Sequence, residues 1–106
     1  MWIVSGKSID MTAGDFGIEL PIAISGVTLG ANDSILFELK KEYNKRTVFT
    51  EEFTNIVNNT VNLVLTEEDS EDLPVGDYVY NLDWYQDGEF MCNIVNGEKF
   101  RVVAKA

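Results

Sequence analysis

The side chains of this chain that could do chemistry are mostly carboxylates. The sequence holds 18 Asp and Glu residues and one cysteine, Cys92, but no histidine. Without histidine the chain lacks the usual general base and transition-metal ligand, and it can form no Ser-His or Cys-His pair. Carboxylate pairs of the kind that hydrolyse glycosides are available anywhere in so acidic a chain, so their presence alone indicates nothing. We therefore expect a protein that is not an enzyme and that holds no cofactor and no metal.

The densest group of acids is the stretch 66–72, Thr-Glu-Glu-Asp-Ser-Glu-Asp. Carboxylates are ligands for Ca²⁺, but the stretch lacks the Asp-x-Asp-x-Asp-Gly spacing that wraps a chain around this ion. Thr66 followed by Asp69 resembles a capping box with Asp in place of Glu, and acids in a first turn suit the helix dipole. We expect a short helical turn near 66–72, stopped by Pro74, with cation binding as the alternative.

Cys92 is expected to face the core as a small apolar residue. It alternates in phase with Phe90 and Ile94, and free cysteines are among the most buried residue types. No basic residue lies close to it in the sequence to make the thiol reactive. As the one cysteine of the chain, it also excludes an internal disulfide.

The stretch 73–92 is rich in aromatic residues and raises the question of a ligand-binding surface. Side chains in a strand point alternately to opposite faces, and within 78–85 one parity is apolar while the other carries polar residues. We expect the apolar set to face the core, with Tyr85 near the hairpin end; this set is Tyr78, Tyr80, Leu82 and Trp84. The alternative is a carbohydrate- or small-ligand-binding module that uses 78–85 as a platform, which requires exposed Tyr80 and Trp84.

The elements that must position these residues are short strands. Alternation of apolar and polar residues predicts strands at 16–24, 35–40, 47–50, 61–65, 76–85, 89–95 and 99–103. Pro21 cannot donate to a ladder, so the first strand is expected at an edge, or broken or bulged there. Turn chemistry separates the strands at 42–46, 58–59 and 86–88, and Asn96-Gly97 marks a further turn or bulge.

Length and composition place the chain among globular proteins. With 106 residues, of which 45% are hydrophobic, it is expected to form a single domain over 1–106 with one core. About seven or eight short strands with turns every eight to twelve residues favour an all-β sandwich or a small barrel.

The net charge and the apolar runs exclude several partners. A formal charge of −10 repels phosphate groups, so neither nucleic acid nor an anionic membrane is an expected partner. No window approaches the ~18 apolar residues of a membrane span. The stretch 1–5 lacks the basic start of a signal peptide and is cut off by 6–8, so we expect no signal peptide and a cytosolic protein.

Tyr78 makes the fold prediction more specific. It opens a strand just after Leu73-Pro74-x-Gly76, where immunoglobulin-like sandwiches place a tyrosine whose hydroxyl bonds to an upstream backbone group. Antibody domains have a cysteine where this chain has Tyr80, and their tryptophan lies on an earlier strand than Trp84 does. We therefore predict an immunoglobulin-like antiparallel β-sandwich of about seven or eight strands that is not an antibody-type domain.

Three stretches, in this order, carry a resemblance that spans nearly the whole chain. They are 6–15 (Gly-Lys-Ser-Ile-Asp-Met-Thr-x-Gly-Asp), 63–69 (Leu-Val-Leu-Thr-Glu-Glu-Asp) and 73–82 (Leu-Pro-x-Gly-x-Tyr-x-Tyr-x-Leu). With them the chain resembles the immunoglobulin-like N-terminal domain of phage and prophage baseplate upper proteins and related tail-associated proteins. Longer members of that group continue into coiled-coil or receptor-binding regions. Because this sequence ends at Ala106, just after the last predicted strand, it is expected to be an accessory protein.

The resemblance implies a virion structural or adaptor protein that acts through protein–protein contacts with tail, baseplate or head components. Other phage structural proteins are then the expected partners, and a homo-oligomer is a further expectation. The protein would be a virion component or lie in the bacterial cytoplasm. An inhibitor-like sandwich that plugs a host enzyme with its loops fits the same fold.

Exposed edge and loop positions are the expected interaction surface, namely Trp2, Tyr43, Tyr85 and Met91. Tryptophan and tyrosine are enriched at the residues that dominate interface energies. For Trp2 a second interpretation stays open, in which an N-terminal strand lies across one end of the sandwich.

Overall fold

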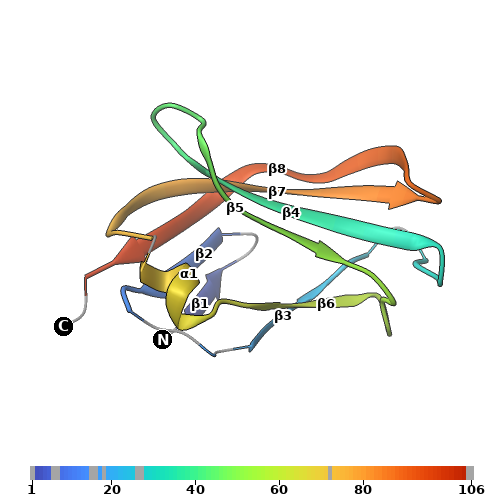
Figure 1. The fold of residues 1–106 in the computed structure, drawn as a ribbon, viewed down its shortest axis with the longest axis horizontal. Helices are drawn as coiled ribbons and strands as arrows, with labels where there is room; N and C mark the ends of the chain where they lie inside the picture. Colours follow the sequence, from blue (N-terminus) through green and yellow to red (C-terminus); the bar gives the residue numbers. More distant parts are fainter. Residues whose placement is uncertain are drawn as a thin grey trace.

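The computed structural model describes residues 2–5, 8–14, 17, 19–25, 28–71 and 73–104, with the backbone alone for 2–5 and for residue 70. In these residues the chain forms strands and one short helix (Figure 1). The elements are β1 (Trp2–Ser5), β2 (Ser8–Thr12), β3 (Glu19–Ala23), β4 (Asp33–Lys41), β5 (Thr47–Phe53), β6 (Thr60–Val64), α1 (Glu67–Glu71), β7 (Gly76–Gln86) and β8 (Glu89–Val103). The predicted all-β class with a helical turn near 66–72 is thus confirmed.

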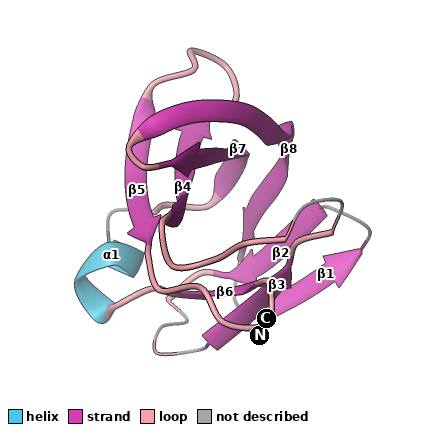
Figure 2. Cartoon of the chain, turned by 90° about the vertical axis from the view of Figure 1, so that its right-hand side faces the viewer, coloured by secondary structure: helices cyan, strands magenta, loops and turns pink. Residues whose placement is uncertain are grey.

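The strands form two layers. A six-stranded sheet has the order β1-β2-β8-β7-β4-β5, and a two-stranded sheet pairs β3 with β6. Figure 2 shows the small sheet on one side of the large one. Immunoglobulin-like sandwiches order their strands G-F-C-C′ in one sheet and place B beside E in the other. The order β8-β7-β4-β5 and the pair β3-β6 follow the same arrangement.

One strand pair departs from the predicted antiparallel layout. β2 runs parallel to β8, with Ile9 opposite Phe100 and Thr12 opposite Val103, whereas the other pairs between the named strands are antiparallel. No tight turn joins β2 to β8, so the two strands are not constrained to run in opposite directions.

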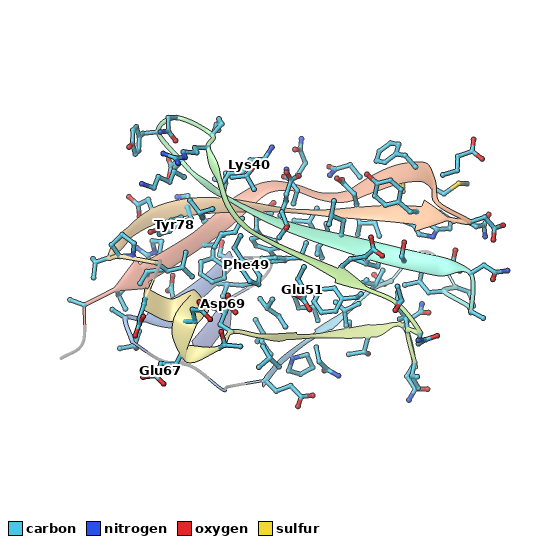
Figure 3. The ribbon with its side chains drawn as sticks, viewed as in Figure 1. Lys40, Phe49, Glu51, Glu67, Asp69 and Tyr78 are labelled. Carbon is cyan, nitrogen blue, oxygen red and sulfur yellow. The ribbon has the colours of Figure 1, made fainter. Side chains whose placement is uncertain are left out.

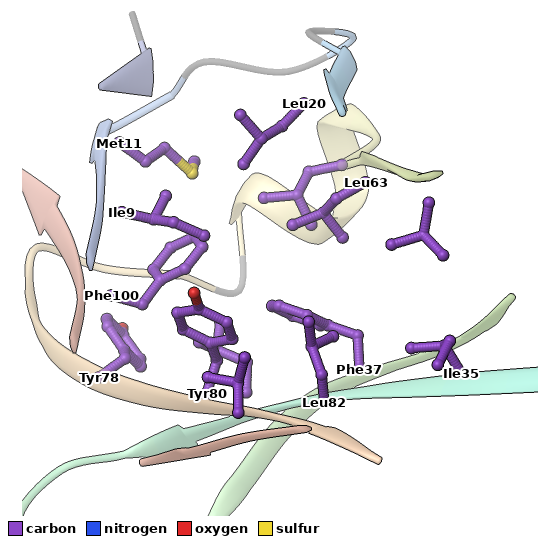
Figure 4. Close-up of a cluster of buried hydrophobic side chains, with 14 of the residues drawn as sticks. Ile9, Met11, Leu20, Ile35, Phe37, Leu63, Tyr78, Tyr80, Leu82 and Phe100 are labelled. Atoms are coloured by element: carbon purple, nitrogen blue, oxygen red, sulfur yellow. The ribbon is translucent and has the colours of Figure 1, made fainter. Parts of the chain in front are cut away.

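The core lies between the two sheets. In β4, buried residues alternate with partly exposed ones, and Ile35, Phe37 and Leu39 are fully buried. The rings of Phe37 and Tyr80 are stacked with centroids 5.5 Å apart. Figure 4 shows side chains of the large sheet, Phe37 and Tyr80 among them, directed toward Leu63 of the small sheet. Burying this apolar surface is the main driving force of the fold.

β3 lies at an edge, as Pro21 predicts. It pairs with β6 alone, where Pro21 stands opposite Asn62. The side chains of Leu20 and Ile24 are buried. The beginning of the predicted strand, including Phe16 and Ile18, lies outside the described residues.

Local bonds define both ends of the segment between β6 and β7. The hydroxyl of Thr66 accepts from the backbone N–H of Asp69 at 3.1 Å, and the Asp69 carboxylate accepts from the N–H of Thr66 at 3.0 Å. This is the reciprocal bonding of a capping box. At the other end the Tyr78 hydroxyl donates to the carbonyl of Pro74 at 2.7 Å, which forms the predicted tyrosine corner.

Two turn predictions are resolved by the backbone. Asp87 and Gly88 have φ angles of 52° and 79°, as a two-residue hairpin with both central residues left-handed requires. Asn96-Gly97 forms a bulge and not a turn, because β8 continues through it while its register with β7 shifts between Tyr80 and Leu82.

The prediction that Cys92 lies in the core is wrong. Its side chain is exposed, and so is Phe90 at 54%. Two further register shifts against β7, next to Asp83 and next to Tyr85, insert extra residues into β8 and break the two-residue period. Phe90 consequently lies opposite Tyr85 on the outer face, so it does not share a phase with Cys92. Cys92 lies opposite the partly buried Trp84, near the hairpin end, and is exposed there.

Candidate functional site

The structure places the predicted interaction residues at different ends of the molecule. Tyr43 is 82% exposed at the tip of the β4–β5 hairpin. Met91, 43% exposed, follows the β7–β8 turn, and Tyr85 is partly exposed just before that turn. The side chain of Trp2 lies outside the described residues. These positions therefore do not form one surface.

Most of the aromatic strand faces the core. Tyr78 and Tyr80 are 2% and 3% exposed, as parity predicts. Trp84 packs against the core and is partly buried. Its indole N–H donates to a carboxylate oxygen of Asp33 at 2.9 Å. Burial also raises the pKa of the Tyr80 hydroxyl to about 12, so this hydroxyl is not a general acid or base near neutral pH.

An exposed apolar patch covers the outer face of the large sheet near the β7–β8 turn. We call Leu36, Tyr85 and Phe90 the outer patch. Leu36 lies between the fully buried Ile35 and Phe37 in β4 and so points away from the core. The rings of Tyr85 and Phe90 meet edge to face with centroids 5.7 Å apart. The contact between the two rings restricts their side-chain rotamers, which lowers the entropic cost of association.

Beside the outer patch the surface is hollowed. The hollow has a volume of about 490 Å³ and is lined by the ends of β4, β5 and β7, including Leu36, Tyr85, Glu52 and Asp87. We call it the acidic hollow, because both exposed charges among these residues are carboxylates. An aromatic ring beside carboxylates suits an ammonium or guanidinium group, which is attracted to both.

Hydrogen bonds hold the rim of the acidic hollow in place. The backbone N–H of Gly30 donates to Asp33 at 2.6 Å, and the N–H of Asp87 donates to the carbonyl of Asn32 at 2.9 Å. The bonds from Gly30 and then from Trp84 hold the pKa of the Asp33 carboxyl below its usual value. Asp33 is buried with both oxygens bonded, so it is a structural residue and not a ligand for a partner.

Charges are segregated along the molecule. The stretches 31–38, 50–65 and 81–98 contain no lysine or arginine. The basic residues within the described part lie instead at the other end of the large sheet, on β4, its hairpin and the second half of β8; they are Lys40, Lys41, Lys45, Arg46, Lys99 and Arg101. The strand register joins these positions, since Lys40 lies opposite Val79, which lies opposite Lys99. Among the described residues, the charged side chains at the end that carries the outer patch are therefore all acidic.

The other polar clusters of the described part have structural roles. Arg101 forms a two-pronged ion pair with Asp10, with N–O distances of 3.0 and 3.1 Å, that links β8 to β2. The pair lowers the pKa of Asp10 and raises that of Arg101. Within the described ranges, no group of three or more His, Cys, Asp or Glu side chains is arranged to hold a metal ion.

A second cavity, of about 310 Å³, opens between the sheets beside β3. Its walls are mainly core side chains, among them Ile22, Leu82 and Val95. Ser25 and Tyr80 are the polar side chains among the residues that line it, and none of the lining residues is charged. The cavity therefore offers no ionic group to orient a charged ligand.

In the described part of the chain, no helix is long and apolar enough to cross a membrane.

The chain has no recognisable relative in three comparisons with known proteins: no family model, no curated protein and no solved structure matches it.

Sequence reasoning found Tyr85 but missed the side chains that complete the outer patch. Leu36 could have been found, because it interrupts the polar parity of β4. Phe90 was assigned to the wrong face, since the bulges of β8 cannot be read from the alternation. Glu52 reaches the acidic hollow only because β5 pairs with β4.

Proposed function

We propose that this protein is a non-enzymatic structural or adaptor module of a phage or prophage particle, associated with the tail or baseplate. It acts by docking its outer patch and acidic hollow onto another structural protein. The observation that carries the proposal is the exposed Tyr85–Phe90 pair above a hollow at an end without basic residues. The resemblance of the sequence to tail-associated sandwiches supplies the biological class.

The chemistry of the surface indicates the kind of partner. Aromatic residues and methionine are enriched in interface cores, and Met91 lies next to Phe90 with 43% of its surface exposed. Carboxylates at the rim speed association with a basic surface and disfavour an acidic one. The partner is therefore a protein surface with an apolar centre and basic neighbours.

The carbohydrate-platform alternative depends on two rings, of which one is buried and the other only partly exposed. It requires exposed Tyr80 and Trp84, whereas Tyr80 is 3% exposed and the indole N–H of Trp84 is bonded to Asp33. This leaves the stretch 78–85 without a continuous row of exposed rings.

The test first establishes whether tail or baseplate genes lie beside the gene for this protein, and then uses the purified products of those genes. We expect at least one of them to bind the protein in isothermal titration calorimetry. Replacing Tyr85 and Phe90 together by alanine is expected to weaken that binding at least about 30-fold, because two aromatic side chains of an interface centre are lost.

The matched control is Val57→Ala, which removes a 68% exposed apolar side chain from the loop before β6. It is expected to leave the affinity unchanged. Binding that is equally strong in the double alanine variant would refute the docking surface. A gene neighbourhood without virion genes, or the failure of every virion protein to bind, would refute the biological class.

A further inference from the structure

The end of the molecule opposite the acidic hollow carries a protruding basic hairpin. Residues 40–46 connect β4 to β5, and we call them the basic hairpin. They include Lys40, Lys41, Lys45 and Arg46 against a single acid, Glu42. In Figure 3 Lys40 lies at the base of this projection, at the end of the sheet away from the β7–β8 turn.

The backbone of the basic hairpin is held in one shape. The N–H of Lys41 donates to the carbonyl of Arg46 at 2.9 Å, and the N–H of Lys45 donates to the carbonyl of Lys41 at 2.8 Å. The side-chain oxygen of Asn44 accepts from the N–H of Arg46 at 3.0 Å. Tyr43, 82% exposed, stands at the tip. A preformed loop loses little conformational entropy when it docks.

We propose that the basic hairpin of one copy docks into the acidic hollow of a second copy, so that the protein associates head to tail. The inference rests on the acidic hollow being a docking surface, as under Proposed function, and names a second copy as one of its occupants. Lys45 and Arg46 would approach Glu52 and Asp87, and Tyr43 would lie against the outer patch.

A hairpin cannot reach the hollow of its own chain. Both sites are fixed to the same rigid strands, because Lys41 lies opposite Tyr78 while Ser34, in the hollow, lies opposite Tyr85. Seven residues of extended strand separate these two rungs, or about 23 Å. The contact must therefore join two different surfaces of two molecules. It gives a two-fold dimer if both contacts form reciprocally between two copies, and a ring or an open filament if they do not.

The charge of −10 per chain opposes self-association, but salt limits this repulsion. At physiological ionic strength the Debye length is about 8 Å, which is short beside the 41 Å length of the molecule. Charges at the far ends are then screened from each other, and the groups at the contact decide the sign of the interaction. At the proposed contact, the basic residues of the hairpin face the carboxylates of the acidic hollow.

The test is sedimentation velocity in about 0.15 M salt at increasing protein concentration, up to about 1 mM. The wild-type protein is expected to show a mass that rises with concentration. One variant alters the hairpin, Lys45→Asn with Arg46→Glu, and another alters the hollow, Glu52→Lys with Asp87→Asn. Asparagine is used at positions 45 and 87 because both have positive φ, which asparagine tolerates.

Each variant alone is expected to associate at least about tenfold more weakly than the wild type. Each keeps one intact surface, so an equal mixture is expected to form a 1:1 dimer and nothing larger. The charge-matched control, Glu68→Lys with Glu71→Gln on the exposed face of α1, is expected to associate at least as well as the wild type.

Three outcomes would overturn the inference: a wild-type protein that stays monomeric throughout, association that neither variant weakens, or a mixture that grows beyond the dimer. The proposed function is tested separately, by the calorimetric experiment with virion proteins, and would be refuted there if none of them binds. A monomeric protein that binds such a partner through Tyr85 and Phe90 would refute head-to-tail association alone.

Discussion

Single residues fix the path of the chain between its two sheets. Tyr78 is 2% exposed, and its hydroxyl bonds to the carbonyl of Pro74, four residues earlier. This bond closes the connection that crosses from α1 to β7. The ring contributes to the core while the hydroxyl satisfies a backbone group that would otherwise be shielded from water.

Tyr78→Phe should lower the free energy of unfolding by about 1 kcal/mol, because a net hydrogen bond is lost while the ring stays packed. Urea denaturation followed by tryptophan fluorescence measures the change. Tyr43→Phe, at an 82% exposed position, is the control and should change nothing. Equal stabilities of the Tyr78 variant and the wild type would show that the corner does not stabilise the fold.

Elements depart from regular geometry most strongly in β8. Three register shifts against β7 bend this strand, and they occur over the stretch 89–98, before its pairing with β2 begins at Phe100. An unpaired edge can recruit strands from other chains, and bulges hinder such pairing. The bulges also turn Phe90 toward the outer patch. The same irregular segment of β8 therefore hinders pairing at the edge and contributes a residue to the candidate site.

Gly97→Ala should lower the free energy of unfolding by about 1 kcal/mol. Gly97 has a φ angle of 66°, and an added Cβ would meet no atom within 4 Å, so the cost is backbone strain alone. Gly30→Ala is the matched control, since Gly30 has no left-handed φ and an added Cβ there would contact an Asp33 oxygen at 3.7 Å. A thermal unfolding series compares the two; a cost at Gly30 equal to that at Gly97 would contradict the strain argument.

The whole molecule is a rigid sandwich with opposite surface properties at its two ends. One end carries the acidic hollow and the outer patch, the other the basic hairpin. Both are fixed to β4, which lies between β7 and β5 in the large sheet. Loosening the core would therefore disturb both ends at once.

Alkaline pH should destabilise the whole sandwich through its core tyrosines. Burial raises the pKa of Tyr80 to about 12, above the usual tyrosine value of about 10, and it also raises that of Tyr78. Because the pKa of Tyr80 is higher in the folded than in the unfolded protein, its neutral hydroxyl contributes to the free energy of unfolding. This contribution is complete below pH 10 and is lost as the pH rises toward 12. Tyr80 alone should account for a loss of about 2 kcal/mol over this range.

The measurement is urea denaturation at several pH values between 9 and 12. Tyr80→Phe removes the ionisable group and keeps most of the ring packing, so its stability should fall less steeply with pH than that of the wild type. Tyr43→Phe again serves as the control and should leave the slope as it is. Parallel curves for the wild type and Tyr80→Phe would exclude Tyr80 as the cause.

The sequence by itself determined the features that depend on near neighbours. Alternation placed Phe37 and Tyr80 in the core, Thr66 and Asp69 capped the helix, and Asp87-Gly88 closed its hairpin. In each case the deciding interaction spans a few residues or follows from the period of a strand. The fold class and the tyrosine corner could therefore be predicted from the sequence alone.

Only the tertiary structure decided the candidate site. Glu52 and Leu36 reach Tyr85 through the pairing of β5 with β4 and of β4 with β7. Phe90 was placed on the wrong face because a bulge shifts the alternation by one residue, and the sequence pattern does not show the bulge. Cys92 lies opposite Trp84 and is nevertheless exposed near the hairpin end. The basic residues of the described part, which are spread along the sequence, gather at one end of the large sheet only when the strands align. The candidate site depends on strand register, which is set by residues far apart in the chain. This is the physical reason why the sequence alone did not predict the site.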